Sequence, residues 1–257
     1  MVKIYGLLAM LMLIFFYCQP EREKNNNEAK KNLTKNTDII FQGSGAEPNW
    51  EVKINVNGGI HFISDTEIKN AVTLNSKIIP IMDVAANSFQ GETDSTNIRV
   101  EIFKNKCIDS QSGDTLTYKT KVMVKKSSDE KYYEFEGCGK HYPDYRLNDI
   151  WILVGLNGSK IDKALFKKKR PYIEINLEER KVFGFAGCNN FNGSIAFEGL
   201  DIIFNKDMAV TMMSCPNLEF ESNFIKSLTR SSLTHSIVNN ELILERGDVK
   251  LEFRKSD

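Results

Sequence analysis

Residues 50–62 read WEVKINVNGGIHF and predict a β-hairpin by themselves. Apolar and polar letters alternate as far as Val56, a period of two that buries one face of a strand. Asn57-Gly58-Gly59 predicts a tight turn, after which Ile60 and Phe62 begin a return strand.

The same alternation recurs along the chain, whereas long helical periodicity is scarce. Further predicted strands include residues 98–103, 118–124, 131–136, 173–177, 182–185, 242–244 and 249–253. One helix is predicted over residues 217–228, with Ser214 as its N-cap and Pro216 in its first turn. We therefore expect a mainly β (α+β) protein of two small antiparallel β domains, the second with a packed helix.

The first residues have the order of an export signal. Lys3 precedes residues 4–17, IYGLLAMLMLIFFY, an uncharged run too short for a membrane helix of about 20 residues and typical of a signal peptide. Cys18 follows directly, and this arrangement resembles the lipobox of bacterial lipoproteins, in which the cysteine carries the lipid. Tyr17 departs from the small residue usual at the cut. We expect residues 1–18 to be a lipoprotein signal peptide with lipidated Cys18; an uncleaved short anchor and a cut elsewhere are the alternatives.

Residues 19–37, QPEREKNNNEAKKNLTKNT, predict a flexible tether. Leu33 is the one large apolar residue of this segment, which is rich in Asn, Lys and Glu. Such a composition cannot bury enough apolar surface to offset the entropy lost on ordering. We expect the folded part of the protein to be held off a membrane by this spacer.

The remaining residues suit two domains of ordinary size, which we place at residues 38–147 and 148–257. Lys plus Arg equal Asp plus Glu at 34 each, so the formal net charge is zero. No overall field attracts the phosphates of nucleic acid, and we expect no nucleic-acid partner.

Four cysteines remain after Cys18, two in each expected domain. The simplest interpretation is one disulfide between Cys107 and Cys138 and another between Cys188 and Cys215. A redox pair is the weaker alternative, because the chain contains no Cys-x-x-Cys. Disulfides indicate an oxidising compartment.

The first expected domain contains a Gly-x-Gly-x-Glu-Pro-x-Trp motif. A phosphate-binding loop is excluded because Pro48 and an alternating strand follow the glycines, instead of a helix with a free N-terminus. We expect a tight turn that enters the strand of Trp50, with Trp50 in the core. The motif, with a later Cys-x-Asp and Gly-Cys-Gly, resembles an uncharacterised family of bacterial envelope lipoprotein domains, a resemblance that implies topology and compartment only. The matching residues are Gly43, Gly45, Glu47, Pro48, Trp50, Cys107, Asp109, Gly137, Cys138 and Gly139.

The second expected domain carries three motifs. They are Trp151-x-Leu153, Gly187-Cys188-Asn189-x-Phe191-x-Gly193, and Thr211-Met212-Met213-x-Cys215 before Glu219. Together they resemble the META domain, the HslJ-like family of bacterial envelope proteins. The resemblance implies a compact antiparallel β fold with a packed helix and a loose link to heat shock and antibiotic tolerance.

Two groups of residues are candidates for binding. Asn189, Asn190 and Asn192 could form a polar binding loop; the alternative, which we favour, is that they hold a turn, because Asn tolerates left-handed backbone. Met208, Met212 and Met213 could bind a soft metal, but three Met without His predict core filling instead.

No catalytic motif occurs in the chain. None of its three histidines, His61, His141 and His235, has metal-ligand spacing to another His, Cys or acid, and nucleophile-elbow, zinc-protease and Walker motifs are missing. We expect no enzyme activity, no cofactor and no metal.

The expected function is that of a non-catalytic lipoprotein of the cell envelope, anchored at the outer membrane. Its partner would be a protein, a peptide or a wall component, and its role one in stress. The alternative is an inhibitor of a secreted enzyme, of the lysozyme-inhibitor or protease-inhibitor type. A third hypothesis, a hydrolase acting on wall or lipid, requires a rate abolished by one carboxylate or Ser substitution.

Overall fold

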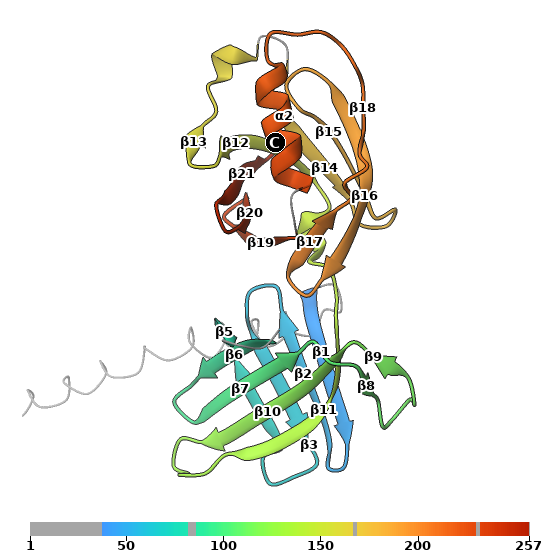
Figure 1. Cartoon of the computed structure of the whole chain (residues 1–257). Coiled ribbons are helices and arrows are strands. Elements are labelled where there is room, and N and C mark those ends of the chain that lie inside the picture. Colours follow the sequence, from blue (N-terminus) through green and yellow to red (C-terminus); the bar gives the residue numbers. More distant parts are fainter. Residues whose placement is uncertain (1–37, 82–85, 167–168, 230–231, 257) are drawn as a thin grey trace, which may run out of the picture.

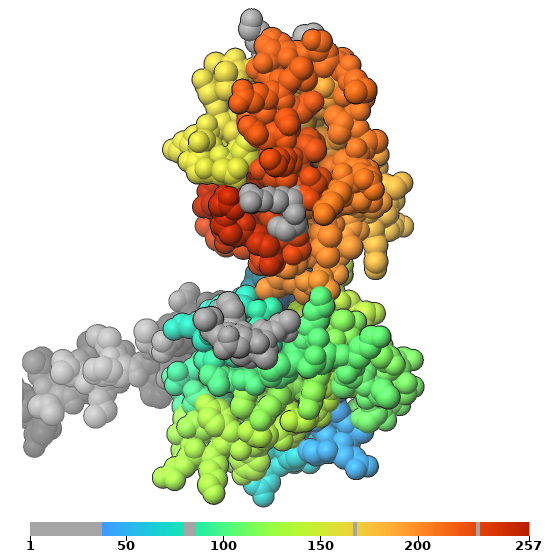
Figure 2. Space-filling model, viewed as in Figure 1, coloured from blue at the N-terminus to red at the C-terminus, as the bar shows by residue number. Residues whose placement is uncertain are grey.

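The computed structural model describes residues 38–81, 86–166, 169–229 and 232–256. The predicted signal peptide, the lipidated Cys18 and the tether lie outside the described residues. Within these residues the protein is mostly β, with a half-barrel sheet, a closed barrel and the single α-helix α2, so the predicted fold class is confirmed. Figure 1 shows the two sheets one above the other, and Figure 2 shows the two halves meeting across a narrower waist.

The N-terminal half is one antiparallel sheet in the order β4-β3-β2-β1-β11-β10-β7-β6-β5. Its strands are β1 (Ile39–Ala46), β2 (Asn49–Asn55), β3 (Ile60–Ser64), β4 (Asn70–Thr73), β5 (Lys77–Ile81), β6 (Ala86–Glu92), β7 (Thr96–Phe103), β10 (Tyr118–Lys126) and β11 (Tyr133–His141). The short strands β8 (Cys107–Ile108) and β9 (Thr115–Leu116) pair with each other beside it.

The hairpin predicted from residues 50–62 is confirmed as β2 and β3. Val52 lies opposite Phe62 and both are fully buried, as the alternation requires. The Asn55 side chain stabilises the turn, since its Oδ1 accepts hydrogen bonds from the backbone N–H of Asn57 at 3.0 Å and Gly59 at 2.8 Å.

The turn predicted before the strand of Trp50 is present, and Trp50 is buried in the core, but the two glycines of the motif are not part of that turn. Gly43 and Gly45 lie inside strand β1, and only Glu47-Pro48 turns the chain. The reason is tertiary: β1 pairs with β11, so that Gly43 faces Gly139 of the distant Gly-Cys-Gly motif. A Cβ on Gly45 would lie 2.8 Å from the Glu136 carbonyl oxygen, which leaves no room for a side chain there.

Gly137→Ala is expected to lower the free energy of unfolding of this half by about 1–3 kcal/mol, because the added methyl group would overpack the core. The added Cβ would lie 2.8 Å from the Ser44 carbonyl carbon and 2.8 Å from the Trp50 ring. Urea unfolding in a Trp151→Phe background isolates the fluorescence of Trp50, the other of the two tryptophans. Gly43→Ala is the control, since its closest neighbour is the Thr120 side chain at 3.1 Å. Equal losses in the two variants would contradict the prediction.

The C-terminal half is a barrel, closed by the pairing of β12 with β21. Its strands are β12 (Ile150–Leu156), β13 (Ser159–Lys160), β14 (Tyr172–Asn176), β15 (Lys181–Phe185), β16 (Asn190–Glu198), β17 (Asp201–Phe204), β18 (Ala209–Val210), β19 (Leu233–Val238), β20 (Glu241–Arg246) and β21 (Val249–Lys255). Short 3₁₀ helices, η2 (Tyr145–Leu147) and η3 (Lys163–Leu165), precede β12 and follow β13. Strand β19 was not predicted.

Helix α2 (Leu218–Thr229) packs on the barrel. Its residues Phe224 and Leu228 are fully buried in the barrel core. The predicted N-cap was wrong, because the helix begins four residues after Ser214 and Pro216 precedes it. The Asn217 carbonyl accepts the first helical hydrogen bond from the Glu221 N–H, and the Asn217 side chain instead binds the Leu165 carbonyl.

Both predicted disulfides are confirmed. Cys107 is bonded to Cys138 with a Cα–Cα distance of 5.5 Å, and Cys188 to Cys215 with a distance of 5.9 Å. The first ties β8 to β11, and the second ties the start of β16 to the segment before α2.

One junction between the two halves is built on Asp144 and Arg146. The Asp144 carboxylate is 2% exposed, accepts hydrogen bonds from the Arg146 guanidinium and lies 3.7 Å from His235 Nε2. The same guanidinium donates to the carbonyls of Val56 in the N-terminal half and Ile237 in the barrel. Asp144 therefore orients a side chain that bonds to both halves.

A second contact lies around His141, at the end of β11. Its Nδ1 is 3.2 Å from the Ile40 carbonyl oxygen, and its ring packs against Phe41 and Tyr118 with centroids 4.8 Å apart in each case. Leu200 of the barrel packs against the core of the N-terminal half. Burial lowers the pKa of His141 to about 4, against the smaller opposing effect of the Ile40 carbonyl.

Candidate functional site

The candidate site begins with Asn189, which follows the sharp turn at Gly187 between β15 and β16. Gly187 has a φ of +103°, a conformation that favours glycine, and turns the chain so that the Asn189 side chain points inward. Asn189 is 2% exposed, and its amide group lies beneath the segment that leads from β18 to α2.

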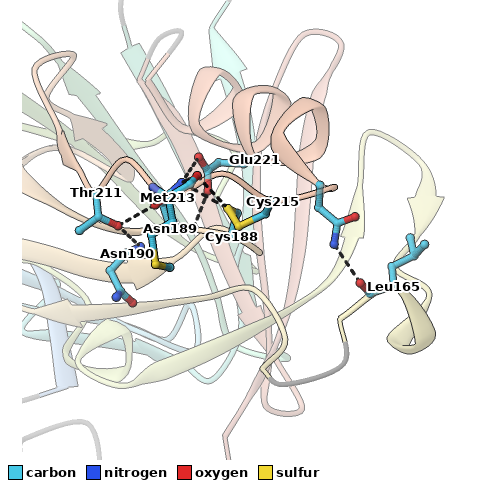
Figure 3. Close-up of a disulfide and its surroundings, with 9 residues drawn as sticks. Leu165, Cys188, Asn189, Asn190, Thr211, Met213, Cys215 and Glu221 are labelled. Atoms are coloured by element: carbon cyan, nitrogen blue, oxygen red, sulfur yellow. Dashed lines mark hydrogen bonds between the residues drawn. A yellow bond between two sulfur atoms is a disulfide. The ribbon is translucent and has the colours of Figure 1, made fainter.

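Asn189 holds that segment at two points (Figure 3). Its Oδ1 accepts hydrogen bonds from the Thr211 hydroxyl at 2.9 Å and from the Met213 N–H at 2.7 Å. Its Nδ2 donates to the Met213 carbonyl at 3.2 Å. The residues on both sides of Met212 are thus fixed by one buried amide.

Glu221 in turn orients Asn189. Its carboxylate comes from the first turn of α2 and is only 8% exposed. One oxygen accepts from the Asn189 backbone N–H at 2.6 Å and the other from its Nδ2 at 3.0 Å. Glu221 was not predicted as a site residue, although the sequence carries a signal for it: Glu221 shares the buried face of α2 with Phe224 and Leu228, at helical spacing.

Met212 and Met213 do not fill the core as predicted, whereas Met208 packs against it. Met212 is 99% exposed and Met213 is 55% exposed, while Met208 is half-buried against the barrel core. The hydrogen bonds of Asn189 fix the backbone on each side of Met212, and the Met212 side chain is left in solvent. Methionine is an apolar residue and predicted burial, but the fixed backbone of the folded chain directs Met212 into solvent.

The three asparagines named as a candidate binding loop have different positions. Asn189 is buried and its polar groups are used within the protein. Asn190 and Asn192 are exposed on β16. The Asn190 N–H donates to the Thr211 hydroxyl, and the Asn190 carbonyl accepts from the Thr211 N–H. The accessible part of this loop therefore lies beside residues 211–213.

Other exposed apolar residues occur on the neighbouring segments. Leu165 is 56% and Leu218 is 45% exposed, and the Asn217 side chain joins their segments through its bond to the Leu165 carbonyl. Val210 is 36% exposed just before Thr211. We call Leu165, Val210, Met212, Met213 and Leu218 the apolar loop surface.

Asn189→Ala is expected to lower the free energy of unfolding of the barrel by about 2–3 kcal/mol, because Glu221 and the Met213 N–H lose their partner. Urea unfolding followed by Trp151 fluorescence in a Trp50→Phe background measures the loss. Asn190→Ala is the matched control, since this side chain is exposed, and it should change stability by less than about 0.5 kcal/mol. A similar loss in both variants would show that the Asn189 side chain does not stabilise the segment from Thr211 to Met213.

Asp109 of the Cys-x-Asp motif is held in contacts within its own loop. Asp109 accepts hydrogen bonds from the Ser112 hydroxyl and from the N–H groups of Gln111 and Ser112, and these bonds lower its pKa against the effect of burial. Within the described ranges, no group of three or more His, Cys, Asp and Glu side chains is placed to hold a metal ion.

A groove of about 570 Å³ lies beside the apolar loop surface, between α2 and the β12–β13 hairpin. Leu156, Ile161 and Phe220 contribute apolar lining, and Lys160 and Lys226 also line it. Leu165 lines it too, so that the groove and the apolar loop surface share one residue.

Residues 144–257 match the META domain, so the motifs quoted from this half predicted the family correctly. The match starts at Asp144 and therefore includes the junction residues before β12. An NMR structure of a protein from Burkholderia xenovorans is 21% identical, with a TM-score of 0.36, and covers 43% of this chain and 85% of that chain. A second NMR structure is 21% identical with a TM-score of 0.36, and covers 42% of this chain and 90% of that chain. No curated protein matches the chain.

Proposed function

We propose that the protein is a non-catalytic, stress-related lipoprotein of the bacterial cell envelope. A lipid on Cys18 anchors it at the outer membrane, and the apolar loop surface binds a protein partner. The exposure of Met212 on a fixed backbone is the observation that carries the binding role.

Two disulfides support the placement in the envelope. Disulfides persist in the periplasm and outside the cell, whereas the cytosol keeps thiols reduced. The META match is consistent with an envelope protein of this kind. Among the described residues no helix has the length and hydropathy needed to cross a membrane.

The binding role follows from the energetics of exposed apolar groups. Met212 lies almost wholly in water, and burial of such a side chain against a partner contributes about 1.5–3 kcal/mol. Because Asn189 and the disulfide already hold the loop, little conformational entropy is lost when it binds. A fixed apolar loop is therefore suited to recognising a protein.

The intact mass of protein extracted from membranes tests the anchor. We expect a chain that starts at Cys18 and carries a diacylglyceryl-sized increment, with four thiols that react only after reduction. Cys18→Ala is the matched control and should remain unlipidated. An unmodified full-length mass with free thiols would refute the placement.

Site-specific photocrosslinking in intact cells tests the binding role. A photoreactive amino acid at position 212 should give a discrete adduct, while the same group at position 238 should not, although Val238 is 65% exposed. Absence of an adduct at position 212, or equal adducts at both positions, would refute the role of this surface.

A further inference from the structure

We propose that residues 210–214 form a substrate-like loop that inhibits a secreted serine endopeptidase, with Met212 bound in an apolar S1 pocket. The inference rests on the proposed function, because it assigns a class of partner to the apolar loop surface. It is drawn from the exposure of the loop, its support and its lack of charge.

The loop has the accessibility that a protease cleft requires. Residues 211–215 lie in no helix, strand or turn, and each residue from 209 to 214 is exposed. Met212 projects furthest into solvent, at 99% exposure. A serine protease receives one side chain of its substrate in the S1 pocket, and Met212 is the residue placed to fill it.

The support beneath the loop distinguishes an inhibitor from a substrate. Thr211 and Met213 are both hydrogen-bonded to Asn189, and Cys215 is bonded to Cys188 two residues beyond. If water hydrolysed the Met212–Met213 peptide bond, the new carboxylate on Met212 and the new amine on Met213 would both remain attached to this support. The cut ends could not leave the cleft freely, and a loop prepared in its bound form associates with little loss of entropy.

The composition of the loop fits an apolar pocket and a dry interface. Residues 208–218, MAVTMMSCPNL, contain no charged residue in a chain that is 26% charged. Burial of this segment therefore incurs no desolvation of charge. Methionine is unbranched and apolar, which suits a hydrophobic S1 pocket and not one with a carboxylate at its base.

The surrounding surface can extend the contact. A stable protease–inhibitor interface buries about 800 Å² on each partner, more than one loop provides. Leu165 and Leu218 add exposed apolar surface on adjoining segments, and Asn190 and Asn192 add polar groups beside residues 211–213. The centre of such an interface would be apolar and part of its rim polar, as in known complexes.

Inhibition assays with the full-length protein in detergent test the proposal. The probes are chymotrypsin and subtilisin, which accept apolar side chains at S1, and trypsin, which requires a basic one. We expect inhibition of at least one of the first two, measured on a small chromogenic peptide, and none of trypsin. Met212→Asp should weaken the inhibition at least about 100-fold, and Met212→Lys should transfer it to trypsin. Val238→Asp, the exposed control, should leave it unchanged.

Asn189 is a positioning residue, and its replacement gives a second readout. Asn189→Ala should convert the loop into a substrate that is cut between Met212 and Met213, as the fragment masses would show. Trp151 fluorescence confirms that each variant is folded before the assay.

The inhibition assay and the crosslinking experiment together distinguish loss of the inhibitor role from loss of the broader binding role. The inhibitor role is overturned if neither chymotrypsin nor subtilisin is inhibited, or if the wild-type loop is cut as fast as in Asn189→Ala. A discrete crosslink at position 212 would then still support a binding protein with another kind of partner. No crosslink at that position together with no inhibition would refute both.

Discussion

Removing the Cys188–Cys215 disulfide by the double replacement Cys188→Ala and Cys215→Ala should lower the free energy of unfolding of the barrel by about 3–4 kcal/mol. The bond joins residues separated by 27 positions, and the open loop gives the unfolded chain additional conformational entropy. Alanine avoids burying a new hydroxyl, since Cys188 is only 3% exposed. The other pair, Cys107 and Cys138 with a separation of 31, should stabilise the N-terminal half by a similar amount.

Two tryptophans allow each half to be followed separately. Trp50 lies in the half-barrel and Trp151 in the barrel, and both are buried. In urea unfolding, the loss from the Cys188/Cys215 variant should be seen by Trp151, and the loss from a Cys107/Cys138 variant by Trp50. Unchanged midpoints after complete reduction of the wild type would show that the disulfides contribute nothing to stability.

Acid should destabilise the N-terminal half between about pH 6.5 and pH 4, because the half-buried His141 ring, packed between Phe41 and Tyr118, favours its neutral form. The folded pKa is about 4, whereas histidine in an unfolded chain has a pKa of about 6.5. Within this window the unfolded chain binds a proton that the folded chain does not, so stability is lost as the pH falls. The difference corresponds to about 3 kcal/mol when the pH reaches 4.

His141→Phe should remove this dependence on pH. A phenyl ring keeps the contacts with Phe41 and Tyr118, and the Ile40 carbonyl retains its hydrogen bond from the Tyr142 N–H. Urea midpoints at pH 7, 5.5 and 4 measure the effect. If His141→Phe loses as much stability as the wild type over this range, His141 is not the group responsible.

A second acid-sensitive group acts at lower pH. Burial alone would raise the pKa of Asp144, but the adjacent His235 and the hydrogen-bonded Arg146 lower it to about 2. A carboxylate with a lowered pKa stabilises the fold above the unfolded value of about 4, and this stability is lost as the pH falls towards 2. The contributions of His141 and Asp144 therefore occupy separate pH windows.

Much of the fold could be predicted from local patterns. Alternation in residues 50–62 indicated a hairpin whose buried face is the observed one, and the cysteine distribution indicated both disulfides. Helix α2 was predicted within one residue at each end. The apolar alternation, the turn residues and the number of cysteines in each half can all be read from the sequence without knowing how distant segments pack.

The errors share a different cause. The turn before Trp50 was predicted but strand β1 was not, because β1 depends on its pairing with β11 nearly 100 residues later, where Gly43 faces Gly139. The N-cap at Ser214 was wrong because the disulfide and Asn189 hold this segment in a non-helical path. Local propensity was overridden in both cases by contacts between distant segments.

The sequence by itself determined the β class, the two cysteine pairs and the META family of the C-terminal half, because these depend on residue type and spacing. Tertiary structure alone decided that Met212 lies in solvent. That outcome needs Asn189 from the start of β16, Glu221 from α2 and the loop backbone to meet at one point. Residue type indicates which groups prefer burial, but the hydrogen bonds that fix a backbone decide which of them are left exposed.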